Sequence, residues 1–184
     1  MKERGKILLW LRLSRVKGLG PITIYRLFQH FKDIERIFSA GENQISEIAG
    51  IKRSIIQELK NPEYIKSAEQ ELKRCEKLGV ELIALDSKDY PENLAQIPDP
   101  PTVLYVRGKF KKEDKRAVAV VGSRNNNEYG EVMAKRIGSG LAKFGITVIS
   151  GMARGIDSIS QQSALEAGGR SIAVLGSGVD VIYP

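Results

Sequence analysis

The sequence predicts an α/β protein in which an N-terminal helical domain precedes a partial Rossmann-like parallel sheet. Two observations lead to this fold class. Up to residue 78, apolar side chains recur at helical spacing, as in Ile48, Ile51, Ile55 and Leu59. After residue 116, short apolar strands alternate with amphipathic helical segments, which is typical of βαβ units.

We expect the helical domain to span residues 1–79. Its predicted helices cover 4–14, 21–31, 43–49, 53–60 and 62–78. Gly18-Leu19-Gly20-Pro21 separates the first two helices and resembles a helix-hairpin-helix turn, and Ala49-Gly50 marks a weaker turn of the same kind. Such a hairpin can offer backbone N–H groups to DNA phosphates or can be a plain helix turn, and the residues leave both readings open.

The second domain is expected over residues 80–184. Two strands, 80–85 and 102–106, flank a proline-rich loop. The α/β part then follows, with strands at 117–121, 146–149 and 171–175 and helices at 128–144 and 156–167. Because the first of these strands reads AVAVV, we expect a sheet that is covered on both faces.

Composition narrows the function classes. No apolar run is long enough to span a membrane, and one cysteine with one histidine makes neither an internal disulfide nor a zinc site of the usual kind. The net charge is +7, of which residues 1–79 hold +6 and residues 80–184 hold +1. A basic balance favours nucleic acid or another polyanion, although ordinary solubility also explains it.

Three glycine-rich loops follow the three strands of the α/β part. The carboxyl ends of parallel strands are where ligands bind in open sheets, and helix N-termini with arginine side chains attract phosphate. We therefore expect an anion-binding mouth, although glycines also simply permit tight turns. Its candidate residues are Gly122, Ser123, Arg124, Ser150, Gly151, Arg154, Gly155 and Gly176.

The same loops contain no recognisable catalytic or cofactor motif. GSRNNNEYG is not the dinucleotide fingerprint G-x-G-x-x-G, and no P-loop lysine motif occurs. We find no Ser/His/Asp set, so we expect no catalytic residues, no cofactor and no metal. Asp157 is expected to charge or cap a helix N-terminus, or alternatively to orient Arg154.

Four blocks of the sequence match a known family in order. They are YPENLAQIPDPPTVLYVRG, VAVVGSRNNNEYG, VISGMARGIDSISQQSAL and IAVLGSGVDVIYP. Together they resemble the DNA-processing protein A family, also called DprA or Smf. The helical part is similar to the sterile-alpha-motif-like or helix-hairpin-helix domain of that family.

The resemblance implies a bacterial cytoplasmic protein that is not an enzyme. It implies binding of single-stranded DNA and loading of the recombinase RecA during natural transformation, in competence and DNA recombination, and a homodimer in the full-length protein. It maps the phosphate pocket to the first two loops and adds Arg170, which precedes the third strand, as a residue that reaches DNA.

Two departures from the family pattern stand out. Gln161 occupies the place of a histidine, so an imidazole role there is lost while a polar contact to DNA or to the sheet can survive. The family also continues beyond the Tyr183-Pro184 pair, with further strands, a basic Arg-Asn-Arg block and a surface for dimerisation and recombinase contact. We therefore expect a fragment with an incomplete pocket.

Two other functions remain as alternatives. One is a nucleoside-phosphate-processing enzyme on a related Rossmann-like fold, which needs a later glycine-rich block with a catalytic glutamate. The other is an interaction domain whose helical region contacts a protein through Lys66, Lys73, Arg74 and Lys77, although such a basic stripe is more commonly a solvated face.

Overall fold

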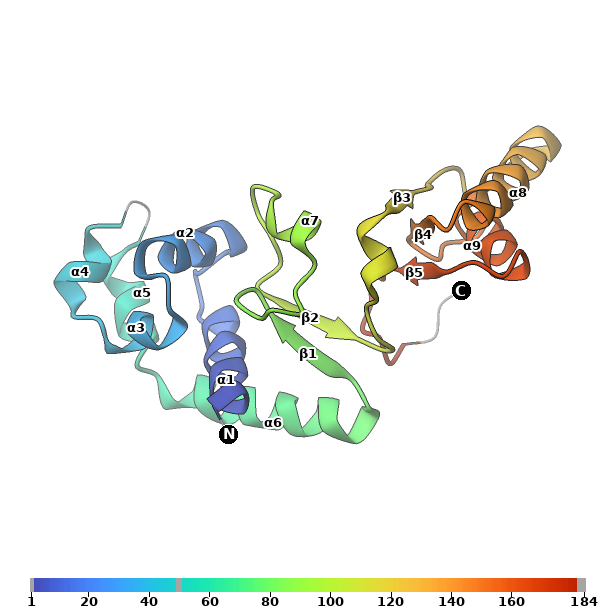
Figure 1. The fold of residues 1–184 in the computed structure, drawn as a ribbon. Helices are drawn as coiled ribbons and strands as arrows, with labels where there is room; N and C mark the ends of the chain where they lie inside the picture. The colour runs from blue at the N-terminus through green and yellow to red at the C-terminus, as the bar shows by residue number, and fades with distance from the viewer. Residues whose placement is uncertain (1, 49–50, 182–184) are drawn as a thin grey trace. The chain divides into compact units, whose positions relative to one another are not determined.

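The computed structural model describes residues 2–48 and 51–181, and its contacts divide the chain into two compact units, Met1–Gly108 and Lys109–Pro184 (Figure 1). The expected turn at Ala49-Gly50 and the Tyr183-Pro184 pair lie outside the described residues. Each unit is described below by itself.

Seven helices and a β-hairpin make up the described part of the first unit. The first six helices are α1 (Lys2–Arg15), α2 (Pro21–Phe31), α3 (Ile34–Ser39), α4 (Glu42–Ser46), α5 (Arg53–Glu58) and α6 (Pro62–Leu78). The hairpin strands β1 (Glu81–Ala84) and β2 (Val103–Val106) are antiparallel, with Glu81 opposite Val106, and the short helix α7 (Glu92–Ala95) lies in the segment between them.

The helix ends follow the sequence signals. Pro21 and Pro62 stand in the first turns of α2 and α6, where the missing N–H costs nothing. Gly79 ends α6 in the left-handed conformation, with φ of 63°. The sequence pattern did not indicate α3, a helix of six residues whose N-terminus is capped by the Asp33 side chain.

The hairpin packs with the helices, so the first compact unit runs to Gly108 and the second begins at Lys109. Leu82 and Val103, one from each strand, lie against a buried cluster of Leu11, Ala68 and Leu72. The indole N–H of Trp10, a residue with no exposed surface, donates to the Asp86 carboxylate at 2.7 Å. These contacts bury the apolar face of a two-stranded ribbon that would be unstable alone.

The second unit has the predicted alternation of strands and helices. It contains a 3₁₀ turn η1 (Lys112–Lys115), then β3 (Ala117–Ala119), α8 (Glu128–Lys143), β4 (Thr147–Ser150), α9 (Ile156–Glu166) and β5 (Ser171–Ala173). The three strands are parallel in the order β3-β4-β5, with Val118 opposite Val148 and Ile149 opposite Ile172. This confirms the predicted fold class.

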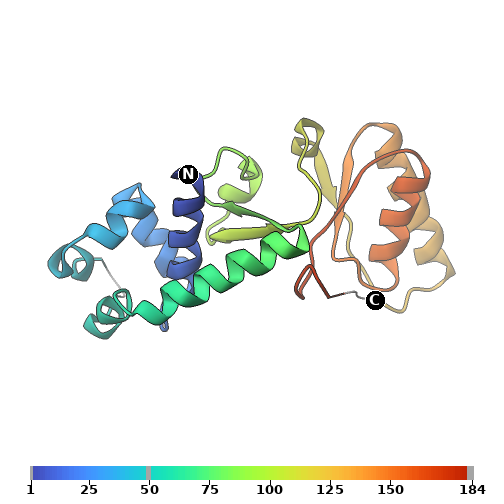
Figure 2. The same ribbon diagram turned by 90° about the horizontal axis from the view of Figure 1, so that it is seen from below.

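One expectation for this sheet was wrong, because α8 and α9 both pack on the same face (Figures 1 and 2). Val148 is fully buried on that face with Ala142 and Ala164. On the other face, Val121 and Val174 are more than half exposed within the described residues. The reason is topological: when strands follow one another across a sheet, successive right-handed crossovers place their helices on one side.

Candidate functional site

The three glycine-rich loops leave the sheet at one edge. The strand pairing continues just past the regular strands, since Val120 N–H donates to Ile149 O and Val174 N–H donates to Ser150 O, both at 2.9 Å. Gly122 and Gly151 follow directly, and Gly176 lies two residues beyond Val174 with open space around it. The carboxyl edge is therefore where the sequence pattern predicted it.

The first two loops are in direct contact. The backbone N–H of Ile156 donates to the Ser123 carbonyl oxygen at 3.1 Å. Gly155 has φ of 85°, and a Cβ at this position would overlap that same carbonyl oxygen. Glycine at 155 is therefore required both by the backbone conformation and by the close approach of the loops.

Asp157 holds the two loops together. Its side chain lies in the first turn of α9 and is buried, and its carboxylate accepts from Gly122 N at 3.3 Å and from Gly151 N at 3.1 Å. Those two N–H groups are consequently occupied by protein. The backbone N–H groups of Gly122 and Gly151 are therefore not free to bind a phosphate, although the sequence had led us to expect that role. Within the described residues, Asp157 makes no hydrogen bond to Arg154, and it does more than cap its own helix.

The two serines of the predicted mouth are also engaged internally. The Ser150 hydroxyl, which is 3% exposed, donates to the Val120 carbonyl oxygen at 2.6 Å and joins β3 to β4. The Ser123 hydroxyl donates to Asn125 O and accepts from Asn125 N, which tightens the first loop. Ser150 is therefore a structural residue, whereas Ser123 still lies at the surface.

Arg124 and Arg154 are the charged groups that remain available at this edge. Both side chains are exposed, and within residues 2–48 and 51–181 neither has a hydrogen bond or an ion pair. Because their loops are joined by the Ile156–Ser123 hydrogen bond and by Asp157, the two guanidinium groups project from one connected surface. Planar guanidinium forks match the geometry of phosphate oxygens.

A shallow groove of about 350 Å³ lies beside these arginines. It is lined by Ser123, Asn125, Asn126, Asn127, Gly130 and Ile156. The Asn127 carboxamide oxygen accepts from Gly130 N at 2.9 Å and so caps α8. The sequence interpretation missed these asparagines, although an asparagine directly before a predicted helix is a recognised N-cap signal.

Arg170 does not join the other candidates. It directly precedes β5 and therefore lies at the amino edge of the sheet, opposite the loops. There its guanidinium binds Asp114, with Nε donating to Oδ1 at 2.6 Å and Nη2 donating to Oδ2 at 3.0 Å. A parallel strand separates its two ends in space, so a residue before β5 cannot share a site with Gly176, which follows it.

Asp114 is the acceptor that organises this amino edge. Burial alone would raise the pKa of its carboxyl, but hydrogen bonds from Arg170, from Lys111 N at 2.8 Å and from the Thr147 hydroxyl at 2.9 Å outweigh burial and lower that pKa. The hydrogen bond between Arg170 and Asp114 in turn raises the pKa of Arg170. Asp114 is thus a charged acceptor for three donors.

Gln161 contacts the sheet, which is one of the two roles that the sequence left open for it. Its amide nitrogen donates to Ser171 Oγ and to Ile172 O, each at 3.0 Å, and the residue is buried. It links α9 to β5 away from the loops.

The turn that resembles a helix-hairpin-helix is compatible with both of its expected roles. Gly18 has φ of 87° and packs against Ile55, which suits a hairpin that contacts DNA and a plain helix turn equally.

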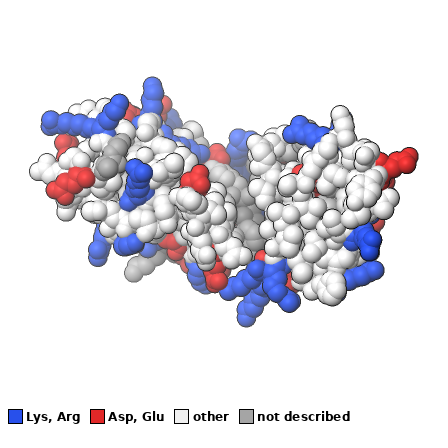
Figure 3. Space-filling model, turned by 90° about the horizontal axis from the view of Figure 1, so that it is seen from above, with Lys and Arg blue, Asp and Glu red and all other residues white. Residues whose placement is uncertain are grey.

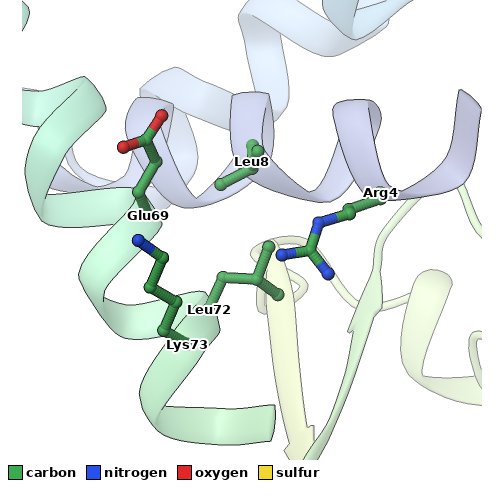
Figure 4. A pocket seen from close by; sticks show the side chains of 5 residues that line it. All are labelled: Arg4, Leu8, Glu69, Leu72 and Lys73. Atoms are coloured by element: carbon green, nitrogen blue, oxygen red, sulfur yellow. The ribbon is translucent and has the colours of Figure 1, made fainter. Parts of the chain in front are cut away.

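A second hollow, in the first unit, has mixed charge. It encloses about 230 Å³ between α1 and α6 and is lined by Arg4, Leu8, Glu69, Leu72 and Lys73 (Figure 4). Arg4 pairs with Glu76, and Lys73 lies one helical turn from Glu69. Paired charges of both signs do not favour an anion, so the loop edge of the second unit remains the stronger candidate.

The described residues contain no group of three or more His, Cys, Asp or Glu side chains placed to hold a metal ion. Nor is any helix in residues 2–48 and 51–181 both long and apolar enough for a membrane span. The net charge, by contrast, is divided more evenly between the two compact units than between the two expected domains. Residues 109–184 carry 11 Lys and Arg against 7 Asp and Glu, a net charge of +4.

Comparison with known proteins decides the family. The family model described as DNA recombination-mediator protein A matches residues 81–184, which include all three loops. The chain belongs to this family. Membership in the DNA recombination-mediator protein A family confirms the resemblance drawn from the four sequence blocks.

Relatives in the DNA recombination-mediator protein A family include Protein Smf of Synechocystis sp., which is 35% identical over 179 residues, 95% of this chain and 45% of that protein. Protein Smf of Escherichia coli K12 is 41% identical over 119 residues, 65% of this chain and 32% of that protein. The chain spans less than half the length of both relatives.

A solved structure agrees with the fold. The X-ray structure of DNA processing protein A from Streptococcus pneumoniae is similar over 94% of this chain and 58% of its own, with a TM-score of 0.75 at 28% identity. The names of these relatives place the family in DNA processing and recombination.

Proposed function

We propose that this chain binds single-stranded DNA at the loop edge of its second unit, as part of a recombination mediator. The observation that carries the proposal is the pair Arg124 and Arg154, exposed on two loops that a backbone hydrogen bond and the Asp157 carboxylate fix to each other. Each guanidinium offers a charge-assisted fork to a phosphate oxygen.

The shape of the site supports a strand as the ligand. The groove beside the arginines is open and is lined by three successive asparagines, whose carboxamides both donate and accept hydrogen bonds. An open groove lets a chain enter and leave, whereas a small nucleotide is usually held in a more enclosed pocket. Contacts through phosphate predict little preference among bases.

The glycines contribute in two ways in this proposal. Gly122 and Gly151 anchor the loops through Asp157 rather than by donating to DNA. Gly155 and Gly176 contribute by having no side chain. Gly155 lets the two loops come into contact, and Gly176 leaves open space for an approaching strand. Ser123 flanks the groove, while Ser150 and Arg170 act in the scaffold.

Family membership supports a wider proposal. We propose that the full-length protein acts in the cytoplasm as a homodimer, is not an enzyme, and loads RecA onto single-stranded DNA during natural transformation. Asp157 supports the non-enzymatic proposal, because its carboxylate at the loop edge is buried and accepts from two backbone amides. The test measures how fast RecA filaments form on single-stranded DNA that is coated with a single-strand-binding protein, with and without the full-length protein.

Binding to a labelled oligothymidine at several salt concentrations tests the proposal. The logarithm of the binding constant should fall linearly with the logarithm of salt concentration, with a slope of about −0.7 for each phosphate neutralised. An equimolar duplex of mixed sequence should compete poorly. Binding that is independent of salt, or equal for the duplex, would contradict the proposal.

A further inference from the structure

We infer that the amino edge of the sheet is a second phosphate-binding surface, built by the segment Lys109–Arg116 and fixed in place by Arg170. This inference rests on the proposed function, because it extends the path of the same DNA strand across the second unit. It assigns a purpose to the one candidate arginine that lies away from the loops.

The segment has an unusual charge density. KFKKEDKR contains five of the 11 Lys and Arg residues of the second unit within eight positions: Lys109, Lys111, Lys112, Lys115 and Arg116. All five side chains are in exposed residues. Surface lysines spread over the whole unit, as ordinary solubility requires, would not gather in this way.

Both acidic residues of the segment have a basic partner, Asp114 in Arg170 outside the segment and Glu113 in Lys111 within it. The Asp114 side chain is only 8% exposed and binds Arg170, and the Glu113 carboxylate lies 3.7 Å from the Lys111 ammonium. What faces solvent is therefore predominantly positive. On the visible face of the molecule, Lys and Arg side chains occur on both units, with Asp and Glu side chains among them (Figure 3).

The segment is also held in a fixed shape. Arg170 Nη2 donates to the carbonyl oxygen of Lys109 at 2.5 Å, and Asp114 receives Lys111 N at the start of the 3₁₀ turn. At the other end, Arg116 O accepts from Thr147 N at 3.0 Å. Cations on a fixed backbone lose less conformational freedom on binding than cations on a loose tail.

The distance between the two edges suits one strand of DNA. β3, β4 and β5 contain only three or four residues, and a strand rises about 3.3 Å per residue, so the regular sheet is on the order of 10 Å deep. A strand of several nucleotides that passes the arginines can therefore continue to the lysines, whereas a strand of three or four nucleotides has few phosphates left for them.

The experiment compares Lys109→Ala/Lys112→Ala with the matched pair Lys135→Ala/Arg136→Ala, which removes the same charge from the exposed face of α8. Affinities are measured for oligothymidines of 4 and 20 nucleotides over a range of salt. For the 20-mer, the first variant should bind about tenfold more weakly at low salt, and its salt slope should be shallower by about 1.4 because two phosphate contacts are lost. The 4-mer, which has few phosphates to reach the lysines, should lose less affinity than the 20-mer.

Two results would overturn the inference. Either the control pair weakens the 20-mer as much as the lysine pair, which indicates a general effect of net charge, or the lysine pair leaves the 20-mer unchanged, in which case the segment only solubilises the protein or meets an acidic protein. In both cases Arg124→Ala still tests the proposed function separately, through the 4-mer. If the wild type binds neither oligonucleotide, the inference and the proposed function both fail.

Discussion

The carboxylate of Asp157 accepts the backbone N–H of Gly151 at 3.1 Å, and its second oxygen accepts Gly122 N from the neighbouring loop. One buried side chain thus joins two loops, and one of its partners, Gly122, lies 35 residues before it in the chain. The Cβ that any other residue would add at 151 would lie 3.0 Å from this carboxylate.

We expect Asp157→Asn to weaken DNA binding by loosening the loops that carry the arginines. An asparagine offers one acceptor and places an NH₂ group against the other backbone N–H, and an unmet buried donor costs about 1–3 kcal/mol. Thermal unfolding and oligonucleotide affinity should both decline. The matched change Glu166→Gln, on the exposed side of α9, should alter neither, and a wild-type affinity in Asp157→Asn would contradict a positioning role.

Two glycines of α8 should respond oppositely to alanine. A Cβ at Gly138 would overlap the Ser160 carbonyl oxygen where α8 meets α9, whereas a Cβ at Gly140 meets nothing within 4 Å. Gly138→Ala should therefore destabilise the second unit by about 1–3 kcal/mol through overpacking. Gly140→Ala should stabilise it by up to about 1 kcal/mol, because alanine favours the helix.

Urea unfolding of both variants measures this difference. Equal effects of the two substitutions would mean that the close packing of α8 against α9 through Gly138 does not hold in solution.

The lowered pKa of Asp114 predicts that the protein loses stability at acid pH. A carboxyl whose native pKa lies below its unfolded value of about 3.9 stabilises the fold above that value and loses this contribution as pH falls through the native pKa. The melting temperature of Asp114→Asn should lie below that of the wild type at pH 6, and the gap should narrow as the pH falls below about 4 and through the lowered native pKa. A gap that stays constant down to pH 2 would argue against the charged contact with Arg170.

The sequence pattern was informative wherever the signal was local. Strand-helix alternation located the loops after β3, β4 and β5, and Pro21, Pro62 and Gly79 marked helix ends. The resemblance placed Arg170 before the third strand, where it lies, and counted it with the loop residues as a DNA contact. The rule that a residue before a parallel strand lies at the amino edge separates it from Gly176.

Other features depend on contacts that no local pattern contains. The Asp157 carboxylate reaches Gly122 only after two βα units have folded side by side. The boundary at Gly108 depends on Leu82 and Val103 burying themselves against α1 and α6, which composition does not reveal. The strand order β3-β4-β5, and with it the one-sided placement of α8 and α9, likewise follows from tertiary pairing.

The central claim is that Arg124 and Arg154 bind the phosphates of single-stranded DNA. The most direct measurement is the salt dependence of oligothymidine binding by the wild type, Arg124→Ala, Arg154→Ala and the double variant, with unfolding curves as a check on folding. Each single change should weaken binding about 10- to 100-fold at low salt and reduce the steepness of the salt slope by about 0.7, and the double variant by about 1.4. Wild-type affinity and slope in the folded double variant would contradict the account.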